Sequence, residues 1–168
     1  MTRTRVVVVA TVAAMLGAWL LQPDDQHTMT VIHVTDGDTI TVRAHSHGAT
    51  PEVVRILGVD TPETHHPRKG IQCFGPEAAE ATRAALLGKE VTIVRGLQPT
   101  DVYGRTLARV SLDGRSFAEW LVSQGYARVL VFSPNDSDAR SLVGLEQHAR
   151  ESLRGLWGAC PGAGHDGQ

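Results

Sequence analysis

The 168-residue sequence has no excess of positive charge: 16 Lys and Arg stand against 18 Asp and Glu, for a formal net charge of −2. This excludes a protein that attracts polyanions over its whole surface, so contact with nucleic acid would have to come from a local site. The chain also lacks internal repeats, low-complexity segments and runs of one charge. Its 42% hydrophobic and 20% charged residues are typical of one globular domain with tails.

Long hydrophobic runs are absent except at the N-terminus, where Val6 to Leu21 is uncharged and follows Arg3 and Arg5. As a helix this run would span about 24 Å, short of a hydrocarbon core of ~30 Å, which favours a signal peptide on length. No small-x-small cleavage site follows Leu21, so an uncleaved signal-anchor remains open. Either alternative places the protein outside the cytoplasm, secreted or attached to the membrane.

These features divide the chain into four segments. They are a signal peptide or signal-anchor (1–22), a linker (23–28), one domain (29–158) and a C-terminal tail (159–168). We expect a monomer.

Cysteine is scarce, with Cys73 and Cys160 as the two examples. Because an exported chain meets an oxidising compartment, we predict that they form a disulfide. It would close a loop of roughly 85 residues and contribute about 4 kcal/mol in the chain-entropy model. The alternative is two unrelated buried thiols.

Hydrophobic patterning predicts an α+β domain. An Asp-Gly pair between two β-branched runs predicts a hairpin, and further strands are expected over 52–59, 90–95, 105–112 and 126–132. Residues 96–104 read as a loop. Helices are predicted over 74–89, with Pro76 in its first turn and Gly88 at its end, and over 116–125. A last helix places Leu142, Leu145, Ala149 and Leu153 on one face. This order fits a five-stranded OB-type β-barrel with three helices.

Two groups of acidic residues could carry chemistry. Asp36 and Asp38 flank Gly37 in the predicted hairpin turn, although Asp-Gly turns are usually structural. Asp60 and Glu63 follow the strand over 52–59 and are separated by a Thr-Pro pair that keeps the chain extended. Carboxylates and backbone carbonyls suit Ca²⁺ or Mg²⁺ better than zinc.

Two arginines could contact an anion. Arg55 lies inside an apolar strand, where its partner must be a structural carboxylate or a ligand phosphate. Arg105 opens a strand beside a turn and could point into the same site, or could be a solvated strand-end residue. Two arginines, a hard cation and a free carboxylate are what hydrolysis of a phosphodiester would need.

The adjacent His65 and His66 suggest a metal site at first sight. In an extended chain they point to different sides, and they have neither helical i,i+4 spacing nor a cysteine partner. We interpret them as loop residues near substrate.

Six segments, in this order and spacing, closely resemble the staphylococcal nuclease (thermonuclease) family: DGDTI, RILGVDTPET, HPRKG, GPEA, DVYGRTLA and GLW. The resemblance runs from about Thr30 to Trp157. It implies a five-stranded OB-type barrel with three helices. It also implies Ca²⁺-dependent hydrolysis of DNA and RNA at the 5′ P–O bond, leaving 3′-phosphate ends.

The resemblance assigns roles residue by residue. Asp38 and Asp60 would bind Ca²⁺ through their carboxylates, and Thr61 through its carbonyl. Glu63 would orient or activate the attacking water.

The remaining roles concern phosphate and substrate. Arg55 and Arg105 would bind the scissile phosphate, with Arg105 also assisting the leaving group. Asp36 would support the site from behind, and Tyr103 would lie near the substrate phosphate. Arg68 and Lys69 are expected to contact phosphates at the rim.

The chain departs from the family pattern at two flanking positions. Val102 replaces a lysine and Leu130 replaces a substrate-side tyrosine, so we expect a weaker hold on polymer. The main alternative is a non-catalytic nucleic-acid or protein-binding module on the same barrel, as in relatives that have lost catalytic residues. A small-molecule-binding OB domain is a third reading. Retention of all five central residues argues against both: Asp38, Arg55, Asp60, Glu63 and Arg105.

Overall fold

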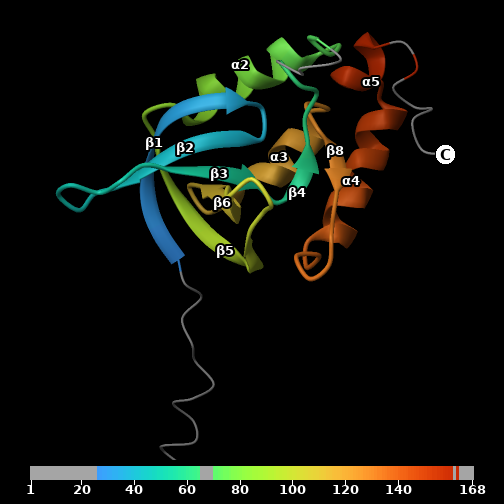
Figure 1. Ribbon diagram of the computed structural model, residues 1–168. Helices are drawn as coiled ribbons and strands as arrows, with labels where there is room; N and C mark the ends of the chain where they lie inside the picture. The colour runs from blue at the N-terminus through green and yellow to red at the C-terminus, as the bar shows by residue number, and fades with distance from the viewer. Residues whose placement is uncertain (1–25, 65–69, 161, 163–168) are drawn as a thin grey trace, which may run out of the picture.

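The protein folds around a small closed β-barrel, seen in a computed structural model that describes residues 26–64, 70–160 and 162 (Figure 1). The strands are β1 (Gln26–Asp36), β2 (Thr39–Ala44), β3 (Glu52–Ile56), β4 (Gly58–Asp60), β5 (Glu90–Thr100), β6 (Thr106–Leu112), β7 (Arg115–Ser116) and β8 (Arg128–Leu130). The helices are α2 (Gly75–Leu86), α3 (Phe117–Ser123), α4 (Ala139–Glu151) and the short α5 (Leu156–Ala159).

The barrel closes through a parallel pair. The main sheet runs β3-β2-β1-β5-β6-β7 with antiparallel neighbours. β3 and β6 are the first and last of the five barrel strands in this order. They pair with each other in parallel, with Arg55 opposite Leu107, and this closes the barrel. The predicted five-stranded OB-type α+β fold is therefore confirmed. The closing pair places Arg55 one residue from a strand end, where its side chain can reach the barrel rim.

Inward-facing side chains of the five barrel strands form the core. Val31, Ile40, Val54, Ile93 and Val110 are among those with no more than 1% of their surface exposed. Such full burial stabilises each aliphatic side chain by about 1.5–3 kcal/mol relative to exposure. The ends of the barrel strands are therefore held by a tightly packed core.

Three helices cover the barrel, as predicted. α2 lies across the top of the barrel in Figure 1 and buries Leu86, and α4 stands beside α3. The first turn of α2 contains Pro76, and Gly88 follows its end. The hydroxyl of Ser116 accepts a hydrogen bond from the Glu119 amide at 3.3 Å, so the predicted cap of α3 is present.

Several boundaries differ from the prediction because pairing partners override local composition. β1 begins at Gln26, opposite Val94, so residues 26–28 belong to the strand and not to a linker. β5 continues to Thr100, opposite Thr106, through the segment predicted as a loop. The strand predicted over 52–59 divides in two, because β3 pairs with β2 and β6 whereas β4 pairs with β8.

The C-terminal region also differs from the prediction. Leu153 was expected on the buried face of the last helix, but α4 ends at Glu151 and Leu153 is 68% exposed. The additional helix α5 follows, and its Leu156 amide donates to the Gly125 carbonyl at 2.9 Å. Leu156 and Trp157 are buried against α4 in a second small cluster with Ala149. The segment between α4 and Cys160 is thus packed against the rest of the fold.

The predicted disulfide is present. Cys73, just before α2, is bonded to Cys160, just after α5, with 5.9 Å between their Cα atoms. Among the described residues no helix is long and apolar enough to cross a membrane. The predicted leader, residues 1–22, lies outside the described residues, as do 23–25 of the predicted linker.

Candidate active site

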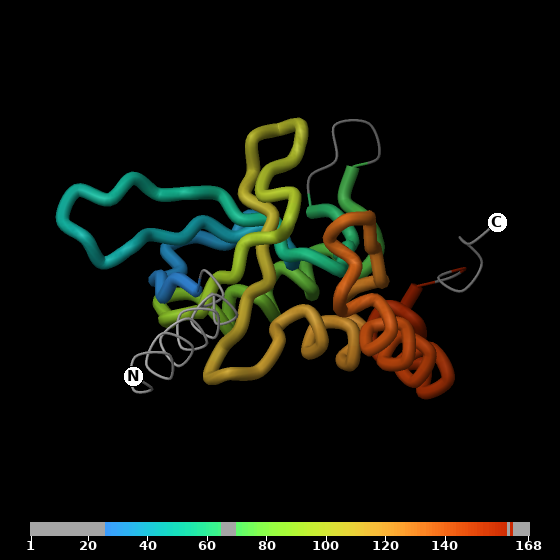
Figure 2. Tube along the Cα trace, turned by 90° about the horizontal axis from the view of Figure 1, so that it is seen from below, coloured from blue at the N-terminus to red at the C-terminus, as the bar shows by residue number. Residues whose placement is uncertain are grey.

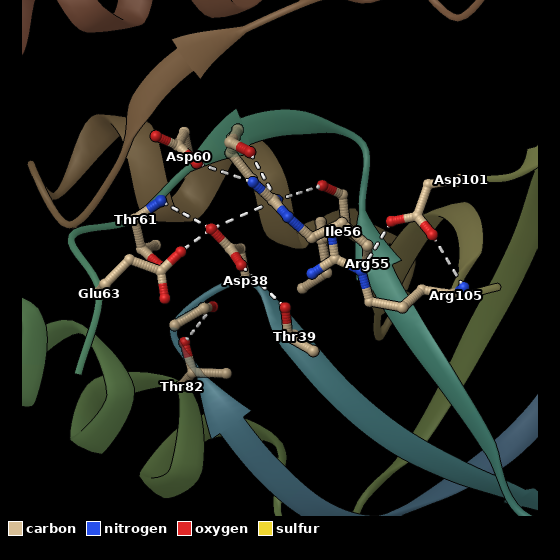
Figure 3. A network of polar contacts seen from close by, with 12 residues as sticks. Asp38, Thr39, Arg55, Ile56, Asp60, Thr61, Glu63, Thr82, Asp101 and Arg105 are labelled. Carbon is tan, nitrogen blue, oxygen red and sulfur yellow. Dashed lines mark hydrogen bonds and ion pairs between the residues drawn. The ribbon is translucent and has the colours of Figure 1, made fainter. Parts of the chain in front are cut away.

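Asp38 is the buried hub of the candidate site (Figure 3). The β1–β2 hairpin, with Asp36 opposite Thr39, holds it in a two-residue turn with Gly37. Its Oδ2 accepts hydrogen bonds from the Thr61 amide at 2.7 Å and the Thr61 hydroxyl at 2.9 Å, and its Oδ1 accepts from the Thr39 hydroxyl at 3.0 Å. Its side chain is only 7% exposed. Asp38 therefore fastens the hairpin turn to the end of β4.

Arg55 links the two acidic groups predicted from the sequence. Its Nη1 lies 3.2 Å from Asp38 Oδ2 and its Nη2 lies 2.8 Å from Asp60 Oδ1. Nη1 also donates to the carbonyls of Val59 at 2.7 Å and Ile56 at 3.1 Å. The side chain is 13% exposed, so these partners satisfy a nearly buried guanidinium. The predicted anionic partner is in this structure a pair of carboxylates.

Close packing keeps Gly37 against Thr61. A Cβ atom at Gly37 would lie 2.7 Å from Thr61 Cγ2, and the Gly37 carbonyl accepts a 2.7 Å hydrogen bond from Thr82 on α2. A side chain at position 37 would therefore displace Thr61. This is the physical reason for a glycine between the two aspartates.

Glu63 lies beside this cluster on the chain leaving β4. Figure 3 shows it on the Thr61 side, with Asp38 and Arg55 between it and Arg105. Within the part of the chain that the structure describes, no group donates a hydrogen bond to its carboxylate. Its carboxylate is thus available to water.

The site carries more negative than positive charge. Desolvation by burial raises the pKa of Glu63, and the carboxylates of Asp36, Asp38 and Asp60 raise it further against the opposing charge of Arg55. Desolvation likewise raises the pKa of Asp60, with Arg55 opposing and Asp38 adding to the rise. Four carboxylates around one guanidinium leave an excess that favours a bound cation.

Asp36 supports the segment that carries Glu63. Its Oδ1 accepts hydrogen bonds from the Thr64 hydroxyl and, at 3.3 Å, from the Thr64 amide. Asp36 therefore holds the residue next to Glu63. That it supports the site from behind stays a prediction.

Arg105 lies on the other side of Arg55 and is oriented by Asp101. Asp101 Oδ2 accepts from Arg105 Nε at 2.7 Å, and Oδ1 accepts from the amides of Tyr103 and Arg105, both at 2.9 Å. Desolvation would raise the pKa of Asp101, but these hydrogen bonds outweigh it and the pKa is lowered. An ionised Asp101 holds the Arg105 side chain by Nε, and no other described residue accepts a hydrogen bond from its two terminal amino groups.

A cavity of about 370 Å³ opens beside the two arginines. Arg55, Arg105, Tyr103, Leu130 and Phe132 are among its lining residues. Tyr103 is 81% exposed, and its ring lies 5.5 Å from the Arg105 guanidinium carbon. In Figure 2 the turn between β5 and β6 and the segment after β8 rise on the same side of the molecule. The cavity is therefore lined by apolar and aromatic side chains together with two arginines.

The structure brings together seven of the predicted site residues: Asp36, Asp38, Arg55, Asp60, Thr61, Glu63 and Arg105. Arg68, Lys69, His65 and His66 lie outside the described residues. Among the residues that are described, no three His, Cys, Asp or Glu side chains form a ready-made metal cluster. Asp38 is instead hydrogen-bonded to Thr61 and paired with Arg55.

Comparison with known proteins identifies the family. Residues 53–159, more than half of the chain, match the family model described as staphylococcal nuclease homologue. The thermonuclease of Staphylococcus hyicus is 35% identical over 133 residues, which cover 79% of this chain and 77% of that protein. The chain belongs to the staphylococcal nuclease family.

Further members of the family are similar over comparable lengths. The thermonuclease of Staphylococcus intermedius is 35% identical over 127 residues, covering 76% of this chain and 74% of that protein. Endonuclease YncB of Bacillus subtilis is 34% identical over 143 residues, covering 80% of this chain and 66% of that protein.

Two positions at which this staphylococcal nuclease homologue was expected to depart from the family pattern lie at the cavity. Val102, where a lysine was expected, is 92% exposed, and Leu130 is 39% exposed and lines the cavity. The cavity wall is consequently apolar at both positions. That this weakens the hold on polymer stays a prediction.

Asp101 was missed by sequence reasoning, which took residues 96–104 as an undifferentiated loop. A signal was present in the printed sequence. An aspartate at the first position of a turn with glycine at the fourth is a typical turn-capping pattern, and here Asp101 caps the turn that ends at Gly104.

Asp101→Asn is expected to lower kcat/KM by about tenfold or more while leaving the fold intact. Asparagine keeps an oxygen for the two backbone amides but presents an amino group where Oδ2 accepts from Arg105 Nε, so Arg105 loses its orientation. Steady-state cleavage kinetics check this. Asp113→Asn, in the exposed turn after β6, is the matched control and should leave the rate unchanged. Equal rates for both variants would contradict the orienting role.

Proposed function

We propose that this protein is an exported, Ca²⁺-dependent nuclease that hydrolyses DNA and RNA without sugar specificity and leaves 3′-phosphate ends. The observation that carries the proposal is the continuous arrangement from Glu63 through Asp38 and Arg55 to Arg105, in a member of the staphylococcal nuclease family. A binding module on the same barrel would have no need of this set.

The residues present fit a hard divalent cation. Asp38, Asp60 and the Thr61 carbonyl would hold it, because these are oxygen ligands in a site whose carboxylates outnumber its guanidinium. When bound, Ca²⁺ would stabilise negative charge that develops on the phosphate. The Thr61 amide and hydroxyl donate hydrogen bonds to Asp38, which supports a ligand role for the Thr61 carbonyl beside that carboxylate.

The arginines act on the phosphate from the cavity side. Arg105 presents its terminal amino groups while Asp101 holds its Nε, so it is suited to bind the scissile phosphate and to stabilise the departing 5′ oxygen. Arg55, in contact with both Asp38 and Asp60, is suited to a second contact on the same group. Tyr103 is exposed and lines the cavity, which supports a contact with the substrate.

Glu63 is suited to orient or deprotonate the attacking water. Its carboxylate lies on the far side of Asp38 and Arg55 from Arg105. This supports a mechanism in which the attacking water and the leaving group would lie on opposite sides of the phosphate. The two ends of the arrangement thus serve an in-line displacement.

Export is supported by two features. The predicted leader has a basic start and an apolar run, and the Cys73–Cys160 disulfide suits an oxidising compartment. The proposal covers both a cleaved leader, which gives a secreted enzyme, and an uncleaved one, which anchors the enzyme to the membrane outside the cytoplasm.

Metal removal tests the proposal. The purified full-length protein should cleave single-stranded DNA and RNA in Ca²⁺, and excess chelator should lower the rate by at least two orders of magnitude. Products should carry 3′-phosphate and 5′-hydroxyl ends, which phosphatase and kinase labelling distinguish.

Two results would count against it. Cleavage that persists in chelator would overturn the calcium site. Intact nucleic acid under every condition, with binding retained, would favour the non-catalytic module.

A further inference from the structure

Gln72 holds the backbone of Glu63 from across the intervening chain. The Glu63 amide donates to Gln72 Oε1 at 2.8 Å, and the Gln72 amide donates to the Glu63 carbonyl at 3.0 Å. Both hydrogen-bonding groups of the Glu63 backbone are therefore satisfied by one residue. Such a reciprocal pair fixes the peptide of Glu63 in position and orientation.

Gly75 packs against the same peptide. A Cβ at this position would lie 2.5 Å from the Glu63 carbonyl oxygen and 3.0 Å from that of Pro62. The Gly75 amide also donates to the Gln72 carbonyl at 3.1 Å. The start of α2 is thus in direct contact with the segment that carries the proposed catalytic carboxylate.

The residues between Gln72 and Gly75 are themselves tied to the rest of the fold. Cys73 is bonded to Cys160, which follows α5, and the Phe74 ring stacks on Tyr126 with 5.8 Å between centroids. Phe74 and Cys160 pack against the buried cluster that contains Leu156 and Trp157. We call residues 72–75 with the Cys73–Cys160 disulfide the Glu63 clasp.

We propose that Gln72 is a positioning residue for Glu63, and that the Cys73–Cys160 disulfide keeps Gln72 in place. This inference rests on the proposed function, in which the Glu63 carboxylate acts on water. A carboxylate with that task must be held within about 0.5 Å of its productive position. Its own side chain has no donor among the described residues, so the precision has to come from the backbone that the clasp holds.

The clasp makes hydrolysis depend on the redox state of the protein. Cys73 is exposed, so a reductant can reach the disulfide. Reduction would free the segment before α2 from α5 and loosen the two hydrogen bonds at Glu63. The enzyme would then be fully active in oxidising surroundings and weakly active in reducing ones.

Two substitutions at Gln72 separate positioning from stability. Gln72→Met removes the acceptor at nearly constant size, and Gln72→Glu keeps an acceptor at the same atom. We expect kcat for single-stranded DNA to fall about tenfold or more in Gln72→Met with KM within about twofold, and to return to within about threefold of wild type in Gln72→Glu. Rates are measured well below the melting temperature of each variant.

Gln147→Met is the matched control. Gln147 lies on the exposed face of α4, and among the described residues its side chain donates to Glu151 alone, at 2.9 Å. The Gln147→Met variant should have the kcat and KM of the wild type. A purely structural role for Gln72 would lower the melting temperature and leave kcat of the folded protein as it was, which would overturn the inference.

The link to the disulfide is tested by combining the changes. Reduction of the wild type by a phosphine should lower kcat about tenfold, whereas Cys73→Ser/Cys160→Ser should have the same low kcat with and without the reductant. Because both changes act through the same contact, Gln72→Met should lower kcat by a much smaller factor in the reduced protein than in the oxidised one. Losses that simply multiply would show that the disulfide does not act through Gln72.

The same data distinguish this inference from the proposed function. A wild type that cleaves nothing overturns both. An active wild type whose kcat is unchanged by Gln72→Met and by reduction overturns the clasp alone.

Discussion

Arg55→Met is expected to abolish cleavage, lowering kcat/KM by about three orders of magnitude or more, and to destabilise the protein. The substitution removes the phosphate contact that the proposed function gives to Arg55. It also leaves the buried Asp38 and the half-exposed Asp60 without their cation, which costs about 3 kcal/mol of unfolding free energy by the usual penalty for breaking a buried pair. Kinetics and urea unfolding measure the two effects.

Two further variants sharpen this result. Arg55→Lys keeps the charge but cannot reach both carboxylates and the Val59 carbonyl at once, so it should recover part of the stability and little activity. Arg95→Met is the matched control. It removes an arginine that pairs with Glu52 on the barrel at 3.0 Å, and it should leave cleavage unchanged. Activity in folded Arg55→Met within tenfold of wild type would refute the assignment.

Glu63→Gln is expected to lower kcat by about 10²–10⁴ without loss of stability. The amide has the shape of the carboxylate but does not accept a proton from water. Because desolvation and three neighbouring carboxylates raise the pKa of Glu63, removal of its charge relieves repulsion. The melting temperature should therefore stay the same or rise, a combination that distinguishes a catalytic residue from a structural one.

Glu80→Gln serves as the control for Glu63. Glu80 pairs with Arg83 on the exposed side of α2 at 2.6 Å, and its loss should change neither kcat nor KM. A Glu63→Gln variant that cleaves at the wild-type rate in Ca²⁺ would show that another group activates the water.

Much of the fold was predictable because its signals are local. The Asp-Gly turn between two β-branched runs, Pro76 in the first turn of α2 and Ser116 before α3 each act within a few residues, and each is found where expected. The errors arose where pairing over long distances decides. β5 continues through Pro99 to Thr100 because β6 offers it a partner.

The residues of the site were predictable from the sequence, but the hydrogen bonds and ion pairs between them were not. Asp38, Arg55 and Asp60 were found from residue type and from the family resemblance. That Arg55 bridges the two carboxylates, and that Asp101 orients Arg105, depends on the parallel β3–β6 pair and the turn after β5. A sequence pattern carries residue types and spacings but not the direction of a side chain.

The sequence by itself determined the family, the order of the strands and of the three predicted helices, and the identity of the candidate reactive groups, because these depend on local pattern and on motifs. Only the tertiary structure decided that Gln72 and the disulfide hold Glu63. The reason is physical: the Glu63 backbone is satisfied by Gln72, nine positions away, and the next residue, Cys73, is bonded to Cys160, 87 positions further along the chain. Contacts at such separations exist only once the chain has folded.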